Sequence, residues 1–213
     1  MVAVVVCGIG AIFVVSGDSK SDQSSNASAP NDRPPAAPSA TSSLASPTGD
    51  LPEFKKMLPV IVTGAVYDQG EQTDIIAEAG WPFAFRVPTG WRCNSAQIID
   101  GDNSAGLECR PPGESNTLLQ VGLRACDQPC DPTTRDLMNR DIAREALTEG
   151  DATTSYAEMA DGRDNVYGLL VSHFFGPEPG KQPTWQVVVR GRSPHTDRAA
   201  VQKVANDIRT QTP

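Results

Sequence analysis

Alternating apolar and polar positions predict a series of β-strands in the C-terminal part of the chain. Residues 83–88 alternate as a half-buried strand that ends at a Thr-Gly-Trp turn. Residues 96–100 and 105–109 flank a turn-forming stretch at 101–104, and together they predict a hairpin. Longer strands are expected over residues 117–124, 166–175 and 185–191.

Two amphipathic helices complete this pattern. The first is predicted over residues 134–149. Its apolar stripe comprises Met138, Ile142 and Ala146. The second is expected to begin with Ser193 as its N-cap and Pro194 as its first helical residue. Its apolar positions, at i, i+3, i+4 and i+7, are Val201, Val204, Ala205 and Ile208. The order of strands, helix, strands and helix predicts an α+β fold over residues 81–213, an antiparallel sheet flanked by helices.

A continuous apolar run occupies residues 2–15 and ends at Ser16. As a helix it would span about 21 Å at ~1.5 Å per residue, less than the ~30 Å hydrocarbon core, and it fits the ~7–15 residues of a signal-peptide core. No Lys or Arg precedes the run. We therefore interpret the true start as lying upstream, and residues 1–16 as a single-pass transmembrane anchor with the C-terminal side extracytoplasmic. Two alternatives stay open: cleavage after Ser16, which would give a secreted protein, and burial of the run in a soluble fold.

The residues that follow the apolar run divide into a linker and an approach segment. Residues 17–50 are rich in Ser, Ala and Pro and contain one large aliphatic residue, Leu44, so they predict a disordered linker. Residues 51–80 are expected to be an extended or docking segment, with a proline-bounded helical turn at 51–59. This segment is predicted either to lie on the domain surface or to dock a partner.

The charge distribution excludes some partners. The net charge is −8 and the pI is about 4.7. Residues 1–80 contain 4 basic and 9 acidic side chains, against 14 and 17 in residues 81–213. An acidic chain lacks the basic footprint that nucleic acids require, and it is unlike a polybasic membrane-surface module. The expected partners are the membrane, through the N-terminal segment, and an unknown envelope protein or ligand.

Four cysteines fall in the predicted domain: Cys93, Cys109, Cys126 and Cys130. An even number on the outer side of a membrane indicates disulfides, with three possible connectivities. We favour Cys93–Cys109, which flank the predicted hairpin, and Cys126–Cys130, which would close a short loop. The C-x-x-x-C spacing is one residue longer than a thioredoxin-like site, and Cys93 and Cys109 do not form a zinc knuckle, so redox and metal sites are the weaker alternatives. Lipidation of Cys7 is disfavoured because Val6 precedes it.

No motif in the sequence supports catalysis. The chain has two histidines. His173 lies on an apolar strand and His195 in the first turn of the last predicted helix, so structural roles are expected for both. Nucleophile-elbow, zinc-protease and phosphate-loop patterns are absent. The sequence therefore predicts no catalytic residue, cofactor or metal site.

One stretch carries a resemblance to a known family. Residues 83–91, Phe-Ala-Phe-Arg-Val-Pro-Thr-Gly-Trp, resemble the opening strand of the PsbP/Mog family, and the order of elements over residues 81–213 is similar. The resemblance implies an α/β/α sandwich and a non-catalytic, accessory or binding role. It also implies kinship with anchored proteins of actinobacterial envelopes. The four cysteines depart from the family pattern.

Two functions from different classes follow from these observations. The favoured one is a membrane-tethered extracytoplasmic binding or accessory domain without catalysis, with an aromatic contact surface at Trp81 and Trp185. Trp91 is expected in the core. The alternative is an envelope hydrolase or thiol-redox enzyme with an unrecognised site, which would need His173 beside a carboxylate in a deep pocket.

Overall fold

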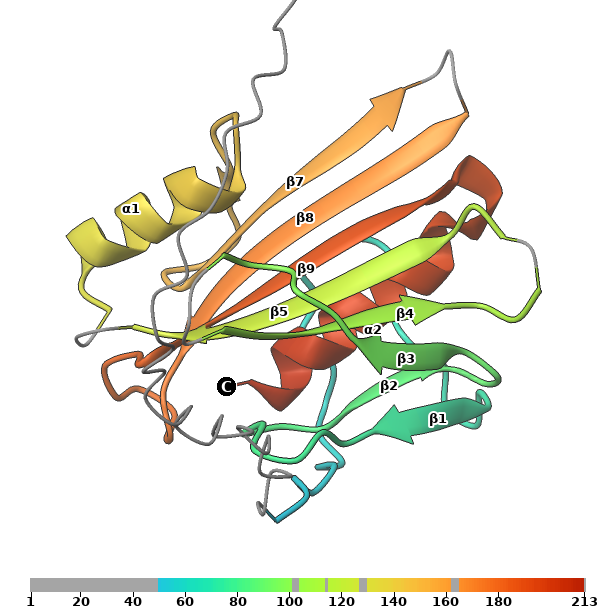
Figure 1. Cartoon of the computed structure of the whole chain (residues 1–213), viewed down its shortest axis with the longest axis horizontal. Coiled ribbons are helices and arrows are strands. Elements are labelled where there is room, and N and C mark those ends of the chain that lie inside the picture. The colour runs from blue at the N-terminus through green and yellow to red at the C-terminus, as the bar shows by residue number, and fades with distance from the viewer. Residues whose placement is uncertain (1–49, 101–103, 114, 127–129, 162–164, 213) are drawn as a thin grey trace, which may run out of the picture. The chain divides into compact units, whose positions relative to one another are not determined.

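The computed structural model describes residues 50–100, 104–113, 115–126, 130–161 and 165–212. The chain divides into two compact units, Met1–Ser43 and Leu44–Pro213, and every described residue belongs to the second. This unit contains a seven-stranded sheet, a two-stranded sheet and two α-helices (Figure 1). The predicted α+β class is therefore confirmed. The predicted segment 1–16, and all of the predicted linker 17–50 except residue 50, lie outside the described residues.

The large sheet is antiparallel throughout and has the order β3-β4-β5-β9-β8-β7-β6. Its two longest strands, β8 and β9, lie side by side near its centre, and the strands predicted in this region are confirmed. The strands are β3 (Arg92–Ser95), β4 (Ser104–Arg110), β5 (Leu118–Ala125), β6 (Thr148–Glu149), β7 (Thr154–Asp161), β8 (Val166–Phe175) and β9 (Trp185–Pro194).

The first arm of the predicted hairpin lies four residues earlier than expected. β3 occupies Arg92–Ser95, and residues 96–100 are not part of a strand. The reason is the register, which pairs Cys93 with Cys109 directly across the two strands. The predicted turn residues 101–103 lie outside the described residues.

Residues 96–99 instead leave the sheet edge and cross over one sheet face. Ile98 and Ile99 pack there on Gly106 and Gly122, which pair with each other in neighbouring strands. A Cβ on Gly122 would lie 2.7 Å from Ile99 Cγ1, a distance that real side chains do not adopt. Glycine is needed at this crossing because the covering chain approaches the sheet backbone itself.

Helix α2 (Arg198–Gln211) covers the opposite face of the sheet (Figure 1). Its predicted stripe of Val201, Val204, Ala205 and Ile208 is confirmed, because all four side chains are buried in the main core. Val201 packs over Gly191 of β9, where a Cβ would collide with it. Burying such a stripe is the main source of stability for a helix of this length.

The predicted start of this helix is wrong. β9 continues through Ser193, which pairs with Tyr167, and ends at Pro194. A single 3₁₀ turn, His195–Asp197, then leads into α2. Pairing with β8 keeps Ser193 extended and buried, so it is unable to serve as an N-cap.

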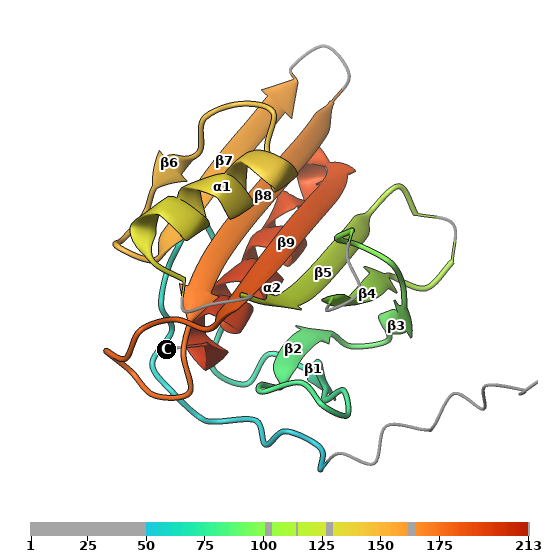
Figure 2. The same ribbon diagram turned by 60° about the vertical axis from the view of Figure 1, so that its left-hand side comes forward.

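Helix α1 (Pro132–Ile142) lies on the face opposite α2 (Figure 2). Ile142 packs on Val188, whose neighbours in β9 face the α2 side. The helix is shorter than predicted because Ala143 adopts an extended conformation (φ −124°, ψ 132°). Ala146 therefore lies beyond the helix and is exposed, and residues 148–149 form β6.

Residues 51–66, here called the strap, run along the outer side of α2, which binds the strap backbone through side chains. Asn206 Oδ1 accepts from the N–H groups of Val62 (2.8 Å) and Thr63 (3.2 Å), while its Nδ2 donates to the carbonyls of Thr63 and Ala65 (2.7 Å each). The predicted helical turn at 51–59 is wrong, because these residues have no helical structure. The strap lies on the domain surface and leads into the small sheet, β1 (Thr73–Ile76) and β2 (Phe85–Pro88). Its large apolar side chains Leu51, Met57, Leu58, Val60 and Ile61 are exposed.

Candidate functional site

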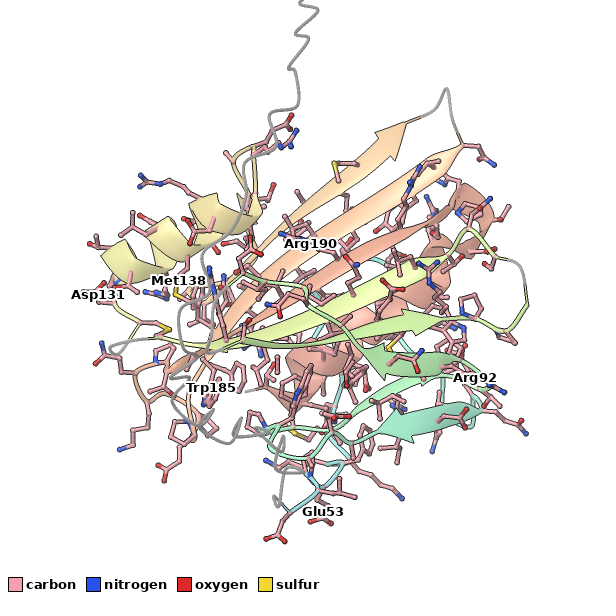
Figure 3. The ribbon with its side chains drawn as sticks, viewed as in Figure 1. Glu53, Arg92, Asp131, Met138, Trp185 and Arg190 are labelled. Atoms are coloured by element: carbon pink, nitrogen blue, oxygen red, sulfur yellow. A yellow bond between two sulfur atoms is a disulfide. The ribbon has the colours of Figure 1, made fainter. Side chains whose placement is uncertain are left out.

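The two tryptophans predicted as contact residues line a single hollow of about 640 Å³. Trp81 is only 6% exposed, and its ring lies 5.5 Å from that of Phe83. Trp185 is half-buried at the first residue of β9 (Figure 3). The expected exposed aromatic patch is thus a concave surface in which Trp81 is mostly covered. Trp91 is buried in the core, as predicted.

The rest of this hollow mixes polar and apolar groups. Leu123 of β5 lines it together with Glu78 and Gln97. Ser95 of β3 also lines it, and the Cys93–Cys109 disulfide, two residues earlier in the same strand, links β3 to β4. Aromatic rings accompanied by an amide and a carboxylate are typical of surfaces that bind a partially polar ligand or a protein side chain.

The favoured disulfide connectivity is present in the structure. Cys93 and Cys109 are joined with an S–S distance of 2.02 Å, and the sulfurs of Cys126 and Cys130 are also bonded. Within the described residues, His, Cys, Asp and Glu do not gather into any group of three or more that could hold a metal ion.

His173 is buried, and both of its ring nitrogens are engaged. Nε2 lies 2.6 Å from the Thr212 carbonyl oxygen, so Nε2 carries the proton and donates it. Nδ1 lies 2.9 Å from Thr154 Oγ1. Burial, and secondarily the charge of Arg209, lowers the pKa of His173 to about 4, so the ring is neutral at pH 7.

A carboxylate approaches His173 only through Thr154. Asp151 Oδ2 lies 2.9 Å from Thr154 Oγ1 and 3.1 Å from Arg209 Nη2, and Arg209 Nε donates to the same Thr154 oxygen. Hydrogen bonds from Thr153, Thr154 and Arg209 outweigh partial burial and hold the pKa of Asp151 well below its usual range. Among the described residues, no carboxylate contacts the His173 ring itself.

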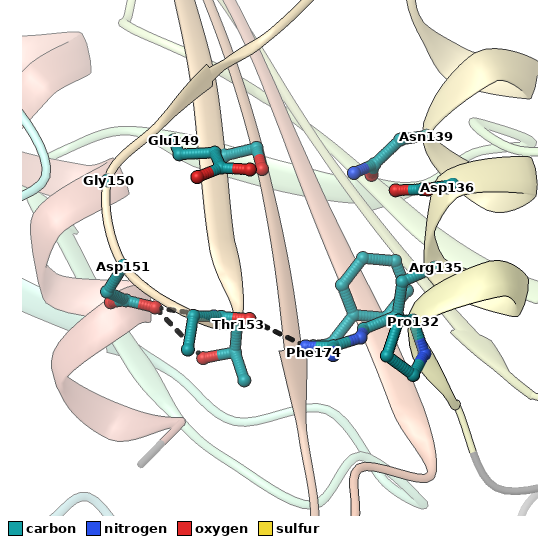
Figure 4. Close-up of a pocket in the computed structure, with 11 residues that line it drawn as sticks. Pro132, Arg135, Asp136, Asn139, Glu149, Gly150, Asp151, Thr153 and Phe174 are labelled. Carbon is teal, nitrogen blue, oxygen red and sulfur yellow. Dashed lines mark hydrogen bonds between the residues drawn. The ribbon is translucent and has the colours of Figure 1, made fainter.

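A second concave site, the α1 cleft, lies between helix α1 and the β6–β7 turn (Figure 4). Its volume is about 590 Å³. One wall is a single stripe of α1 at i, i+3, i+4 and i+7: Pro132, Arg135, Asp136 and Asn139. The other wall is residues 149–153, and Phe174 of β8 lines the space between them.

Hydrogen bonds fix both walls of the α1 cleft. Asp151 Oδ1 accepts from the backbone N–H and the hydroxyl of Thr153, which closes the turn. Arg135 Nη1 donates to the Ala152 carbonyl at 2.6 Å and bridges the two walls. Asn139 Oδ1 accepts from Ser172 (2.7 Å) and Gln186 (3.3 Å), which fixes its amide group on the sheet.

The α1 cleft could not be predicted from the sequence, for a physical reason. The predicted helix over residues 134–149 ran through Glu149, so the far wall was counted as part of the same element. The polar stripe of α1 also looked like an ordinary solvated helix face. The available signal was the turn-forming Gly150-Asp151 pair directly after the predicted helix.

Comparisons of the chain with protein-family models, with curated proteins and with solved structures find no match. Among the described residues, no helix is long and apolar enough to cross a bilayer.

Proposed function

We propose that this chain is a membrane-tethered extracytoplasmic binding or accessory domain without catalytic activity, and that it contacts its partner at the hollow formed by Trp81 and Trp185. The partner class is an envelope protein or ligand; nucleic acid is disfavoured by the acidic chain. The observation that carries the proposal is the convergence of these two tryptophans, 104 positions apart in sequence, on one concave surface.

Large aromatic side chains supply most of the binding energy at many protein surfaces, and they do so from partly enclosed positions. Trp185 has this setting, because it is half-buried and backed by the sheet. The state of His173 supports the non-catalytic part of the proposal. A neutral, buried ring with both nitrogens engaged is poorly placed to take a proton from a substrate.

The proposal includes the PsbP/Mog-like architecture and the extracytoplasmic location. Helices on opposite faces of an antiparallel sheet support the former. Two disulfides support the latter, because such bonds persist in oxidising compartments. The proposed tether consists of residues 1–16 and the linker, which reaches roughly 30–35 Å r.m.s. as a flexible chain.

The experiment that tests the contact surface is site-specific photocrosslinking of the full chain in its native host. A photoreactive amino acid replaces Trp185 in one variant and Glu178, an exposed residue outside the hollow, in the control. We expect a discrete adduct from position 185 and none from position 178. Identical adducts from both positions, or none from position 185, would contradict the proposed surface.

The location is tested separately on intact cells. A membrane-impermeant amine reagent is expected to label exposed lysines such as Lys181, and deletion of residues 1–16 is expected to abolish membrane association. Labelling that occurs only after lysis would place the domain inside the cell.

A further inference from the structure

The α1 cleft is a second concave site, separate from the tryptophan hollow and built from different residues. Its volume, about 590 Å³, lies within the ~300–1,000 Å³ range of small-molecule sites. One rigid helix and one hydrogen-bonded turn form its walls, so its shape does not depend on a mobile segment. The charges in its walls indicate which class of molecule it fits.

One end of the α1 cleft is acidic. Asp136 projects from α1 and Glu149 from β6, and the two side chains face the same space from opposite walls (Figure 4). Both residues are exposed, and neither side chain forms a hydrogen bond or ion pair with any described residue. Two unpaired carboxylates held across a gap provide a favourable site for an ammonium group.

Two residues of α1 bring donors to the same cleft, Arg135 at the end away from Glu149 and Asn139 beside Asp136 (Figure 4). Arg135 uses Nη1 to bind the Ala152 carbonyl, and its buried Nε has no partner within the described residues. The Asn139 oxygen is occupied by Ser172 and Gln186, which leaves its Nδ2 to donate toward the cleft beside Asp136 (Figure 4). The Arg135 guanidinium is suited to a carboxylate.

The third carboxylate in the lining does not change this balance. Asp151 is already bound by Thr153, Thr154 and Arg209, so its charge is compensated within the protein. A lone anion would meet the two unpaired carboxylates, whereas a lone cation would meet Arg135. A molecule with both charges satisfies both ends.

We infer that the α1 cleft binds a small zwitterion of the free α-amino acid class. The ammonium group lies between Asp136 and Glu149, and the carboxylate lies against Arg135. The ring of Phe174, which lines the same space, contacts an apolar side chain of the ligand.

Isothermal titration calorimetry of the full chain in detergent tests this inference, with leucine, alanine and glycine as probes. We expect leucine to bind, and leucinamide and N-acetylleucine, which each lack one charge, to bind at least tenfold more weakly. The inference is overturned if none of the three amino acids binds, or if either single-charge analogue binds as tightly as leucine.

Two substitutions then test which side chains bind the carboxylate and the ammonium group of the ligand. Arg135→Gln and Glu149→Gln are each expected to weaken leucine binding at least tenfold. Arg140→Gln, on an exposed part of α1 outside the cleft, is the matched control and is expected to bind like the unmodified chain. Because Arg135 also bridges the walls, Glu149→Gln, an exposed side chain without partners, provides the decisive result if Arg135→Gln fails to fold. Unchanged affinity in a folded Glu149→Gln variant would refute the acidic end of the site.

Discussion

Gln211 holds both backbone groups of Lys55: its Oε1 accepts from the Lys55 N–H at 3.0 Å, and its Nε2 donates to the Lys55 carbonyl at 2.7 Å. Asn206 repeats this arrangement at Val62–Ala65, and Gln202 Oε1 accepts from the Ala65 N–H. These bonds involve the strap backbone, so they do not depend on the strap's side chains. They also explain why Gln202, Asn206 and Gln211 of α2 are buried.

The substitution Asn206→Ala tests the strap. Asn206 is 1% exposed and binds four backbone groups, which would lose their partners, so we expect a loss of about 2–3 kcal/mol in the free energy of unfolding. Urea denaturation measures this loss, and trypsin cleavage at Lys55 and Lys56 is expected to accelerate. Arg198→Ala, at an exposed position of the same helix, is the control. Unchanged hydrogen exchange at Val62 and Thr63 in Asn206→Ala would show that the strap is held by other contacts.

Among the ion pairs of the described residues, loss of the Arg86–Asp207 pair is expected to lower the free energy of unfolding most. Asp207 Oδ1 accepts from Arg86 Nε at 2.9 Å and from Nη2 at 2.5 Å, and its Oδ2 accepts from the Arg86 backbone N–H at 2.7 Å. Because the carboxylate is buried, Asp207→Ala leaves the guanidinium without its partner and should cost about 3 kcal/mol. Glu108→Ala breaks an exposed pair with Arg110 and should cost at most about 0.5 kcal/mol. Equal losses in the two variants, measured by urea denaturation, would contradict this assignment.

Stability is expected to fall as the pH drops from 7 to 5. The pKa of His173 is about 4 in the folded protein, against ~6.5 in an unfolded chain, so the unfolded state alone takes up this proton in that window. The expected decrease is about 2 kcal/mol. The depressed pKa of Asp151 acts at lower pH, because its contribution is lost only as the pH falls below the unfolded value of ~3.9.

His173→Gln provides the comparison for this pH effect. Urea denaturation of the variant at pH 7 and pH 5 should show a much smaller difference than in the unmodified protein. If both proteins lose the same stability between these pH values, another group is responsible.

The two disulfides should differ in their contributions. Cys93–Cys109 closes a separation of 16 residues and Cys126–Cys130 one of 4. Restriction of the unfolded chain then predicts losses of about 3 and about 2 kcal/mol for the respective Cys→Ser double variants. Denaturation of each variant, with non-reducing peptide mapping to verify the remaining bridge, tests the order. A larger loss for the shorter loop would show that native-state contacts dominate.

The central strands could be predicted because their alternation records which side chains face the core, as for Val187 and Val189 in β9. The ends of the helices were harder to predict from the sequence. Thr148 and Glu149 have helix-compatible neighbours, yet pairing with β7 draws them into a strand. Ser193 has a good capping sequence, yet pairing with Tyr167 keeps it in β9. In both cases pairing with another strand overrides a local preference.

The candidate sites show the same division. Trp81 and Trp185 could be identified by residue type, but their shared hollow depends on the fold. The α1 cleft depends on a turn that is held against a helix by the hydrogen bond from Arg135 to the Ala152 carbonyl. No local sequence pattern predicts this contact. The position of the strap could not be predicted from the sequence either, because Asn206 looks like an ordinary polar position of an amphipathic helix.

The partners joined between the strap and α2 lie 137 to 156 positions apart in the chain. At ~5–20 residues per second, a ribosome makes α2 about 7–30 s after it makes the strap. During that interval the strap's backbone groups lack the side chains that later bind them. A chain halted before Gln202 would contain every strand of the sheet and still leave the strap unbound, so this side of the domain is completed only by α2, the last of its elements to be made.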